Sequence, residues 1–176
     1  MKHEMLFSGI GGQGIMLLGE VLCSVAVAAG YQVTFAPFYG QEKRGGRTMC
    51  HVVISDAMES PIISEAELML IMDERSLQDF QSLMAPQGAL LLNSSMIERE
   101  PACQCREIKK VPFYDIAVEL GNAKVANMVA LGALLKYLPF IPYDKVVAAV
   151  QQAFAAKQKV AALNVQALKA GYTYGF

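Results

Sequence analysis

The sequence lacks the cysteine pattern that would place an iron–sulfur cluster on the chain. Its 176 residues include four cysteines, Cys23, Cys50, Cys103 and Cys105, and no two of them form a Cys-x-x-Cys pair. Ferredoxin-type clusters are held by several cysteines at short, regular spacing, so we expect none here. Reduced thiols are typical of cytosolic proteins, and the role of Cys103 and Cys105 stays open.

The sequence is also poor in charge and contains no tryptophan. Charged residues make up 18% of the chain, and the formal net charge is −1. Nucleic acids and anionic membranes attract proteins that have a basic excess, so neither is expected as a partner. No uncharged apolar run reaches the ~18 residues that a membrane span needs. We therefore expect a cytoplasmic protein.

What the sequence has in quantity is apolar side chains. Hydrophobic residues make up 54% of the chain, and ten methionines supply adaptable apolar surface. This share is higher than is usual for a self-contained monomer, so a partner is expected to bury one face. The length fits a single domain that covers residues 1–176.

Short apolar runs alternate with amphipathic stretches, which predicts strands alternating with helices. The expected strands cover residues 4–8, 31–37, 48–55, 68–72, 89–92 and 106–111, and the expected helices cover residues 15–29, 74–84, 115–120, 125–137, 143–155 and 158–170. The first strand, the first helix and the second strand are expected to form a parallel βαβ unit. Residues 86–88 are expected to form a turn, and Gly30 and Gly171 are expected to end helices. The pattern favours an α/β fold: three-layer α/β/α, Rossmann-like, with a mainly parallel sheet and a helical C-terminal part.

A glycine-rich turn follows the first expected strand and precedes the first expected helix. Gly9, Gly11 and Gly14 have the G-x-G-x-x-G spacing, which lets backbone approach an anion at a helix start. A dinucleotide site also needs an acidic residue at the end of the second strand, and residues 35–38 contain none. This absence speaks against NAD or FAD. Another phosphate or anion, and a purely structural turn, both stay open.

A second glycine-bearing segment, Tyr39–Arg47, joins the next two expected strands. It carries three cations, one acid and three glycines. Its position after the second strand places it beside the glycine turn, at the sheet edge where ligands of α/β folds collect. Arg44 and Arg47 are able to bind phosphates or a partner's carboxylates with their forked donors. The alternative is a solvated surface loop.

The remaining candidates have structural alternatives. Asn127, inside an apolar helix, either reaches the glycine turn or satisfies a nearby backbone group. Asp73 is placed to cap a helix, as are Ser94 and Ser95. His3 and His51 have no partner acid or cysteine at a recognisable spacing, and no Ser/His/Asp, Cys/His or P-loop arrangement is visible.

Three segments together resemble one enzyme family. They are Gly9–Gly14, Tyr39–Gly46 and Gly121–Gly132, and in this order and separation they are similar to the gamma subunit of 2-oxoacid:ferredoxin (acceptor) oxidoreductases. The 2-oxoglutarate and branched 2-oxoacid members look most similar. The resemblance extends through residues 93–95 and 164–172, so it covers essentially the whole chain. Gln41 and Lys43 depart from the commonest family pattern, where Pro and Met or Ala often stand.

The resemblance implies a subunit of an enzyme that oxidatively decarboxylates a 2-oxoacid, such as 2-oxoglutarate, to its acyl-CoA and passes electrons to ferredoxin. Alpha-, beta- and, as a further candidate, delta-type subunits are the implied partners. They would carry thiamine diphosphate and the iron–sulfur clusters, while coenzyme A would lie at or near this chain. The isolated chain is expected to be inactive, and a homo-oligomer is an open alternative when it is expressed alone.

On this basis, no catalytic or metal-binding residue is assigned to the chain, and one set of residues is expected to bind the coenzyme or help assembly. That set is Gly9, Gly11, Gly12, Gln13, Gly14, Tyr39, Gly40, Arg44, Gly45, Gly46, Arg47 and Asn127. Two other functions stay open: a stand-alone nucleotide-binding or redox-sensing Rossmann-like module, and a scaffold with a vestigial site.

Overall fold

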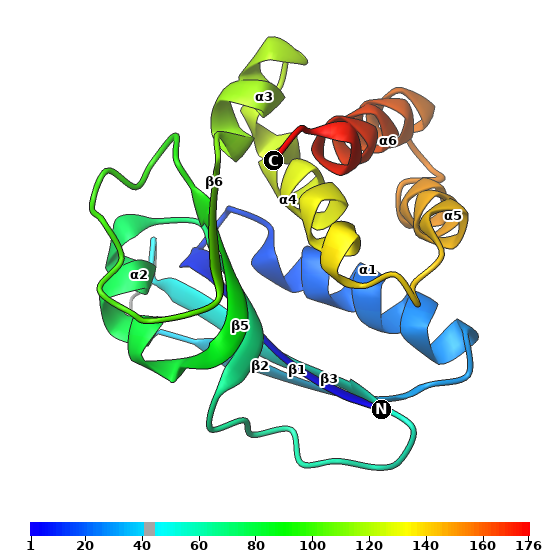
Figure 1. Cartoon of the computed structure of the whole chain (residues 1–176). Coiled ribbons are helices and arrows are strands. Elements are labelled where there is room, and N and C mark those ends of the chain that lie inside the picture. Colours follow the sequence, from blue (N-terminus) through cyan, green and yellow to red (C-terminus); the bar gives the residue numbers. More distant parts are fainter. Residues whose placement is uncertain (41–44) are drawn as a thin grey trace.

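The computed structural model describes residues 1–40 and 45–176 and shows a six-stranded sheet with helices packed against it (Figure 1). The strand order is β2-β3-β1-β4-β5-β6. The strands are β1 (Lys2–Ile10), β2 (Gln32–Tyr39), β3 (Arg47–Ser55), β4 (Ala66–Ile71), β5 (Met84–Asn93) and β6 (Glu107–Val111). The α-helices are α1 (Ile15–Ala28), α2 (Glu74–Phe80), α3 (Phe113–Glu119), α4 (Ala126–Leu134), α5 (Tyr143–Ala153) and α6 (Gln158–Thr173).

The sheet is mixed. Strands β1, β4, β5 and β6 pair in parallel, whereas β3 is antiparallel to both β1 and β2. Strand β2 therefore runs in the same direction as β1, as expected for a βαβ unit, but β3 lies between them. The reason is the connection after β2, which is too short to cross the sheet and so returns the chain antiparallel as a hairpin.

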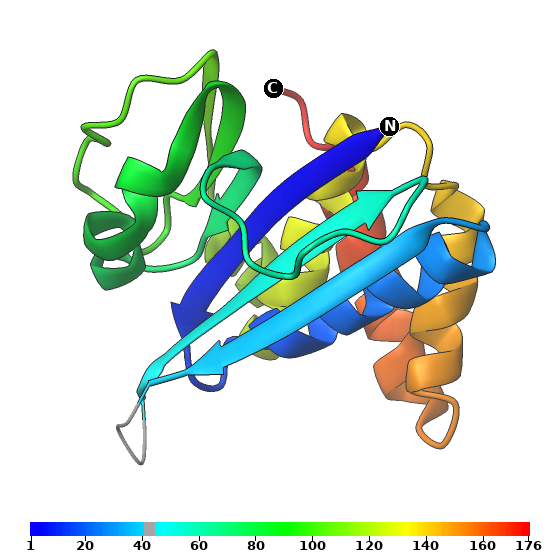
Figure 2. The same ribbon diagram turned by 90° about the horizontal axis from the view of Figure 1, so that it is seen from below.

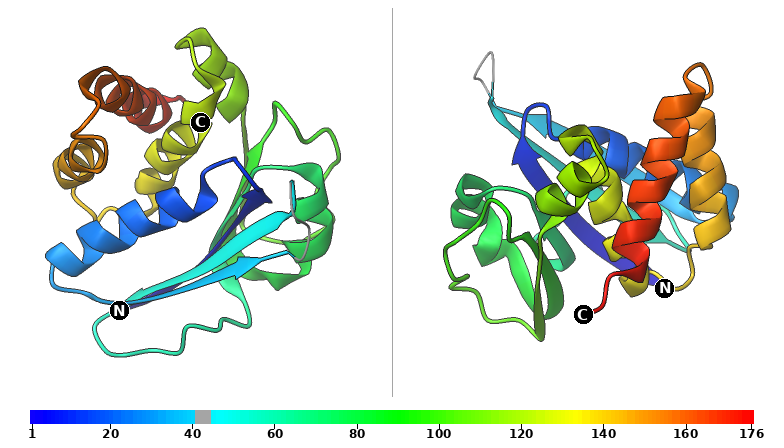
Figure 3. Two further views of the ribbon diagram at one scale, coloured as in Figure 1. Left: turned by 180° about the vertical axis from the view of Figure 1, so that it is seen from behind. Right: turned by 90° about the horizontal axis from the view of Figure 1, so that it is seen from above.

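The two faces of the sheet are covered differently. Helices α1 and α3–α6 gather on one side, where they share the larger apolar core with the sheet (Figure 3). The other side has α2 and irregular segments around residues 56–65 and 94–106 over a smaller apolar cluster. The expected α/β fold is confirmed, with a thin second helical layer. Within the described residues, no helix has both the length and the apolarity needed to cross a bilayer.

Helix α1 ends where its glycine predicts. Its buried residues Ile15, Leu18, Leu22 and Val25 recur at three- and four-residue spacing and face the sheet. Gly30 then adopts a φ of 93°, a left-handed conformation that costs glycine little and stops the helix.

The expected helix end at Gly171 is wrong, because α6 continues to Thr173. A Cβ on Gly171 would collide with the backbone of Val129, and one on Gly132 would collide with the backbone of Leu168. The two glycines thus allow α4 and α6 to approach closely. Their role is helix packing, which sequence spacing alone does not separate from helix termination.

The expected turn at residues 86–88 is also wrong, since β5 begins at Met84 and runs through it. The pairing with β4 shifts register between Ala66 and Leu68. Pro86, which has no N–H to donate, lies opposite this irregularity, where strands tolerate proline. Gly88 packs against the backbone of Glu67 there.

Candidate functional site

The glycine turn joins β1 to α1 and has a backbone that favours glycine at two positions. Gly12 and Gly14 have φ values of 96° and 74°, a region that residues with a Cβ rarely adopt. Gly14 is the N-cap residue of α1, and within the described part of the chain no side chain caps this end. The first amides of α1, which carry a positive partial charge, are thus free to bind a ligand or water.

Two of the expected binding residues shape the turn from inside. The Gln13 side chain folds back, and its Oε1 accepts a hydrogen bond from the Ile10 amide at 2.8 Å. Its Nε2 lies 3.4 Å from the Met96 sulfur. A Cβ on Gly9 would stand 2.5 Å from Gln13 Oε1. Gly9 and Gln13 therefore hold the turn in shape rather than line its open side.

The hairpin between β2 and β3 lies directly against the glycine turn, as its place after the second strand predicts (Figure 2). The Gly11 amide donates to the Gly46 carbonyl at 2.8 Å, and Ile10 stands opposite Arg47 in the β1–β3 ladder. The Gly40 amide donates to the Arg47 carbonyl at 2.7 Å and begins the hairpin loop. The two glycine segments are thus joined through their main chains.

A groove of about 910 Å³ opens between this turn, the start of α1 and the hairpin. Most of the expected site residues that the structure describes line it, together with others from α1 and β3. The lining residues are Gly11, Gly12, Gly14, Ile15, Met16, Leu17, Glu20, Tyr39, Gly40, Gly45, Gly46, Arg47 and Thr48. At the rim, Tyr39 is 68% exposed. Arg44 lies outside the described residues.

Arg47 has a partner within the chain. Its Nη1 lies 2.6 Å from Asp79 Oδ2 on α2, and both side chains are about one-third exposed. From the sequence we considered phosphates and carboxylates of other subunits as partners of this arginine. The structure adds an intrachain carboxylate, so the guanidinium at the base of the hairpin is already neutralised in part.

The sequence analysis missed Met16, Leu17 and Glu20 as groove residues. They follow the glycine turn within the first turns of α1 and line the groove together with residues of the β2–β3 hairpin. The missing signal was helical spacing, because Glu20 lies one turn beyond Met16 on the same face. Glu20 places a negative charge in the groove, so an anionic ligand is favoured at the helix start and disfavoured farther along α1.

Asn127 supports the turn from beneath. It is 4% exposed, and its Nδ2 donates to the Gly14 carbonyl at 3.2 Å. Among the described residues, its Oδ1 is buried without a hydrogen-bond partner. A Cβ on Gly14 would collide with the Asn127 side chain. The two alternatives from the sequence therefore coincide, because Asn127 reaches the glycine turn by satisfying its backbone.

A buried polar chain links the same sheet edge to α2. Asp73 caps α2 by accepting hydrogen bonds from the amides of Arg75 and Ser76 at 3.0 and 3.1 Å, which confirms its expected capping role. The Ser76 hydroxyl donates to Asp73 Oδ2 at 2.6 Å and lies 3.0 Å from the Ser8 hydroxyl on β1. Ser95 also acts near a helix start, where its Oγ accepts from the Asp115 amide at 3.1 Å.

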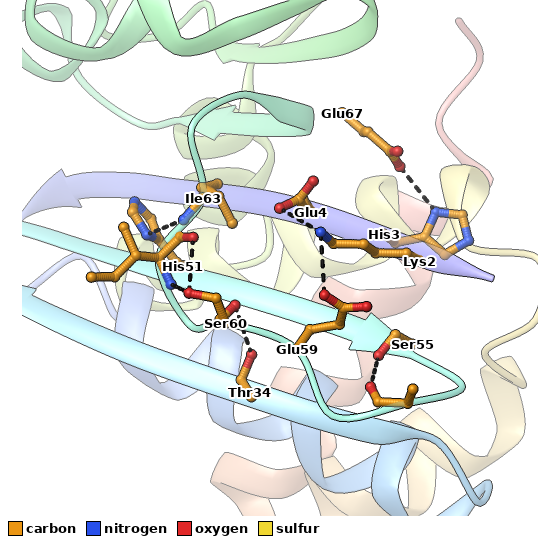
Figure 4. Close-up of polar contacts among 12 residues, drawn as sticks. Lys2, His3, Glu4, Thr34, His51, Ser55, Glu59, Ser60, Ile63 and Glu67 are labelled. Carbon is orange, nitrogen blue, oxygen red and sulfur yellow. Dashed lines mark hydrogen bonds and ion pairs between the residues drawn. The ribbon is translucent and has the colours of Figure 1, made fainter.

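Neither histidine lines the groove, and Figure 4 shows the polar contacts of both. His3 pairs with Glu67 at 3.3 Å and stacks on Phe140. His51 is buried, and its Nδ1 lies 3.5 Å from the Ile63 amide. Burial lowers the pKa of His51, against a smaller opposing effect of the Pro61 backbone. In the part of the chain that the structure describes, no three His, Cys, Asp or Glu side chains gather as a metal ion would require.

Comparison with known proteins gives consistent relatives. The family model described as pyruvate ferredoxin/flavodoxin oxidoreductase matches residues 4–174. Ketoisovalerate oxidoreductase subunit VorA of Methanothermobacter thermautotrophicus is 31% identical over 166 residues, which is 93% of this chain and 34% of that protein. The 2-oxoglutarate synthase subunit KorC of the same organism is 33% identical over 142 residues, which is 76% of this chain and 75% of that protein.

Solved structures share the fold. The gamma subunit of a keto/oxoacid ferredoxin oxidoreductase from Geobacter sulfurreducens aligns with a TM-score of 0.81 and 27% identity, covering 97% of this chain and 96% of that one. A 2-oxoglutarate:ferredoxin oxidoreductase from Magnetococcus marinus, solved with 2-oxoglutarate, coenzyme A and succinyl-CoA bound, aligns with a TM-score of 0.87 and 22% identity, covering 97% of this chain. The chain spans about a third of VorA and 30% of the Magnetococcus chain.

Proposed function

The chain belongs to the pyruvate ferredoxin/flavodoxin oxidoreductase family, and from this premise we propose that it is the gamma-type subunit of a 2-oxoacid:ferredoxin oxidoreductase. The enzyme would convert a 2-oxoacid and coenzyme A to an acyl-CoA and carbon dioxide, with two electrons passed to ferredoxin. Alpha- and beta-type subunits, with a delta-type subunit as a further candidate, are the proposed partners, and the cytoplasm is the proposed location.

Thiamine diphosphate and the iron–sulfur clusters are proposed to lie on those partners. The relatives are named for different 2-oxoacids, namely ketoisovalerate, 2-oxoglutarate and indolepyruvate. Because related chains occur in enzymes named for different 2-oxoacids, a role in assembly and coenzyme handling fits this type of subunit. The choice of 2-oxoacid is therefore assigned to the thiamine-bearing subunits, with 2-oxoglutarate and a branched 2-oxoacid as the candidates that the motifs resemble.

The groove is the proposed contact for a phosphate of coenzyme A. The observation that carries this assignment is the bond from the Gly11 amide to the Gly46 carbonyl, since it closes both glycine segments around an uncapped helix start. A phosphate there would meet main-chain amides and the positive end of α1. Glu20 would repel it from the far end of the groove, which limits the anion to the turn.

The groove assignment is tested by placing a negative charge at the turn. A Cβ on Gly11 would lie 3.5 Å from the Gly46 carbonyl, an ordinary contact, so Gly11→Asp is compatible with the fold. In the purified complex, coenzyme A affinity is expected to fall at least about tenfold, which corresponds to about 1.4 kcal/mol. Gly175→Asp adds the same charge where the structure is open and is the matched control. Equal affinity in both variants would remove the groove from coenzyme binding.

The subunit role has a separate test. The tagged chain, isolated from its native cell, is expected to bring down larger subunits that contain thiamine diphosphate and iron–sulfur clusters. A monomer without such partners would contradict the subunit role, whatever the groove binds.

A further inference from the structure

The segment between β5 and β6 contains two cysteines separated by one residue. Cys103 and Cys105 are both half-buried and pack against the smaller apolar cluster on the α2 side of the sheet. Residues 101–105 have no helical or strand structure. The Ala102 amide donates a hydrogen bond to Gln81 Oε1 at 2.7 Å. The two thiols therefore share a cluster and lie on a stretch of backbone outside the helices and strands.

The two thiols also contact each other. Burial raises the pKa of Cys103 most. The neighbouring Cys105 side chain raises it further, through its charge and through a hydrogen bond. Cys105 Sγ in turn lies 3.3 Å from the Glu107 carbonyl. A disulfide needs Cα atoms about 4.4–6.8 Å apart, a separation that two residues with one between them reach without large backbone movement.

The other two cysteines supply an internal contrast. Cys23 lies on α1 and Cys50 on β3, so both sit on regular elements of the larger core. Burial raises the pKa of Cys23 to about 12 and that of Cys50 still further above its ordinary value. Thiolate is the form that reacts with oxidants, so the large upward shifts of these two pKa values, together with the full burial of Cys50, protect this pair more strongly than the smaller upward shift of the Cys103 pKa protects Cys103.

We propose that Cys103 and Cys105 form a redox-sensitive dithiol that closes to an intrachain disulfide when it meets hydrogen peroxide. One thiolate attacks the peroxide and becomes a sulfenic acid, with release of water. The second thiol attacks that sulfur, the sulfur–sulfur bond forms, and a second water leaves. Two thiols are oxidised by two electrons, and one peroxide is reduced to two waters.

The small ring makes the bond reversible. A disulfide that closes over a single intervening residue is strained, and strained disulfides have more oxidising potentials than structural ones. Dithiol reductants are therefore expected to reopen it fully. The site lies on a different segment from the groove residues, so the proposal stands independently of coenzyme binding.

The test is thiol counting by mass spectrometry on the full chain. After treatment with equimolar hydrogen peroxide and alkylation, Cys103 and Cys105 are expected to lose their label together, with one disulfide in the peptide that contains both. Cys23 and Cys50 are expected to keep theirs. Dithiothreitol is expected to restore all labels.

Single substitutions supply the controls. In Cys103→Ser and in Cys105→Ser, the remaining thiol is expected to stop at sulfenic acid, which dimedone traps, because no resolving thiol is present. The proposal is overturned if both thiols of the unsubstituted chain stay labelled under conditions that convert the single variants to sulfenic acid. It is also overturned if the bond forms to Cys23 or Cys50, or between two chains.

Discussion

Two helices begin at the same edge of the sheet, and their first turns are built in opposite ways. Helix α2 follows β4 and is capped by the Asp73 carboxylate, which takes the amides of Arg75 and Ser76. Helix α1 follows the neighbouring strand β1 and begins at Gly14 with no side-chain cap in the described residues. At a capped helix start, the capping side chain already occupies the position that an external anion would take. Of these two helix starts, the open start of α1 is the one that we propose for an external anion.

The surroundings of the two starts support this difference. Asp73 is 6% exposed and belongs to the buried chain that reaches Ser8 through Ser76. Gly14 lines the groove, with Asn127 supporting its carbonyl from the core side. The junction between β4 and α2 is therefore closed and structural. The junction between β1 and α1 is open toward the groove and is supported from the core side.

The largest expected effect comes from adding a side chain at the open junction. Gly14→Ala forces a left-handed backbone on alanine and pushes its Cβ into Asn127. The free energy of unfolding is expected to fall by about 3 kcal/mol, from backbone strain together with overpacking. Urea denaturation measures it. In the Asn127→Ala background the loss is expected to be smaller because the collision is gone, and equal losses would show that the collision with Asn127 contributes nothing to the effect.

Removing the cap at the closed junction is the next largest change. Asp73→Ala leaves two α2 amides and the buried Ser76 hydroxyl without their acceptor, so stability is expected to fall by about 2 kcal/mol. Coenzyme A affinity of the complex is expected to stay unchanged, since α2 offers no anion site. Denaturation and binding titration of the same preparation check both statements. Asp73→Asn is the matched control, because it keeps a capping oxygen and is expected to lose less.

These two changes also show which parts of the molecule the sequence could predict. The capping residue Asp73 and the glycine turn were predictable because each depends on neighbours within a few positions. The Arg47–Asp79 pair was not, since its members are brought together only by the insertion of β3 between β1 and β2. Gly171 was assigned to a helix end because spacing cannot reveal that another helix needs its missing side chain. Gln13 was predicted to contact the ligand, because the sequence does not reveal that its side chain folds back onto the Ile10 amide.

The smallest expected effect concerns the ion pair between the hairpin base and α2. Arg47 and Asp79 are partly exposed, so their coupling is expected to contribute about 0.5 kcal/mol to stability. A double-mutant cycle with Arg47→Ala and Asp79→Ala measures this coupling. If Arg47 also serves the groove, Asp79→Ala is expected to strengthen coenzyme A binding by freeing the guanidinium, whereas Arg47→Ala weakens it. Identical affinity in both variants would confine Arg47 to its structural pair.

The most direct test of the open helix start is amide hydrogen exchange in the purified complex with and without coenzyme A. Exchange is expected to slow at residues 11–17, at the start of α1, while residues 74–77, at the start of α2, exchange as before. Protection that is absent at α1, or equal at both helix starts, would contradict the claim that the uncapped junction is the anion site.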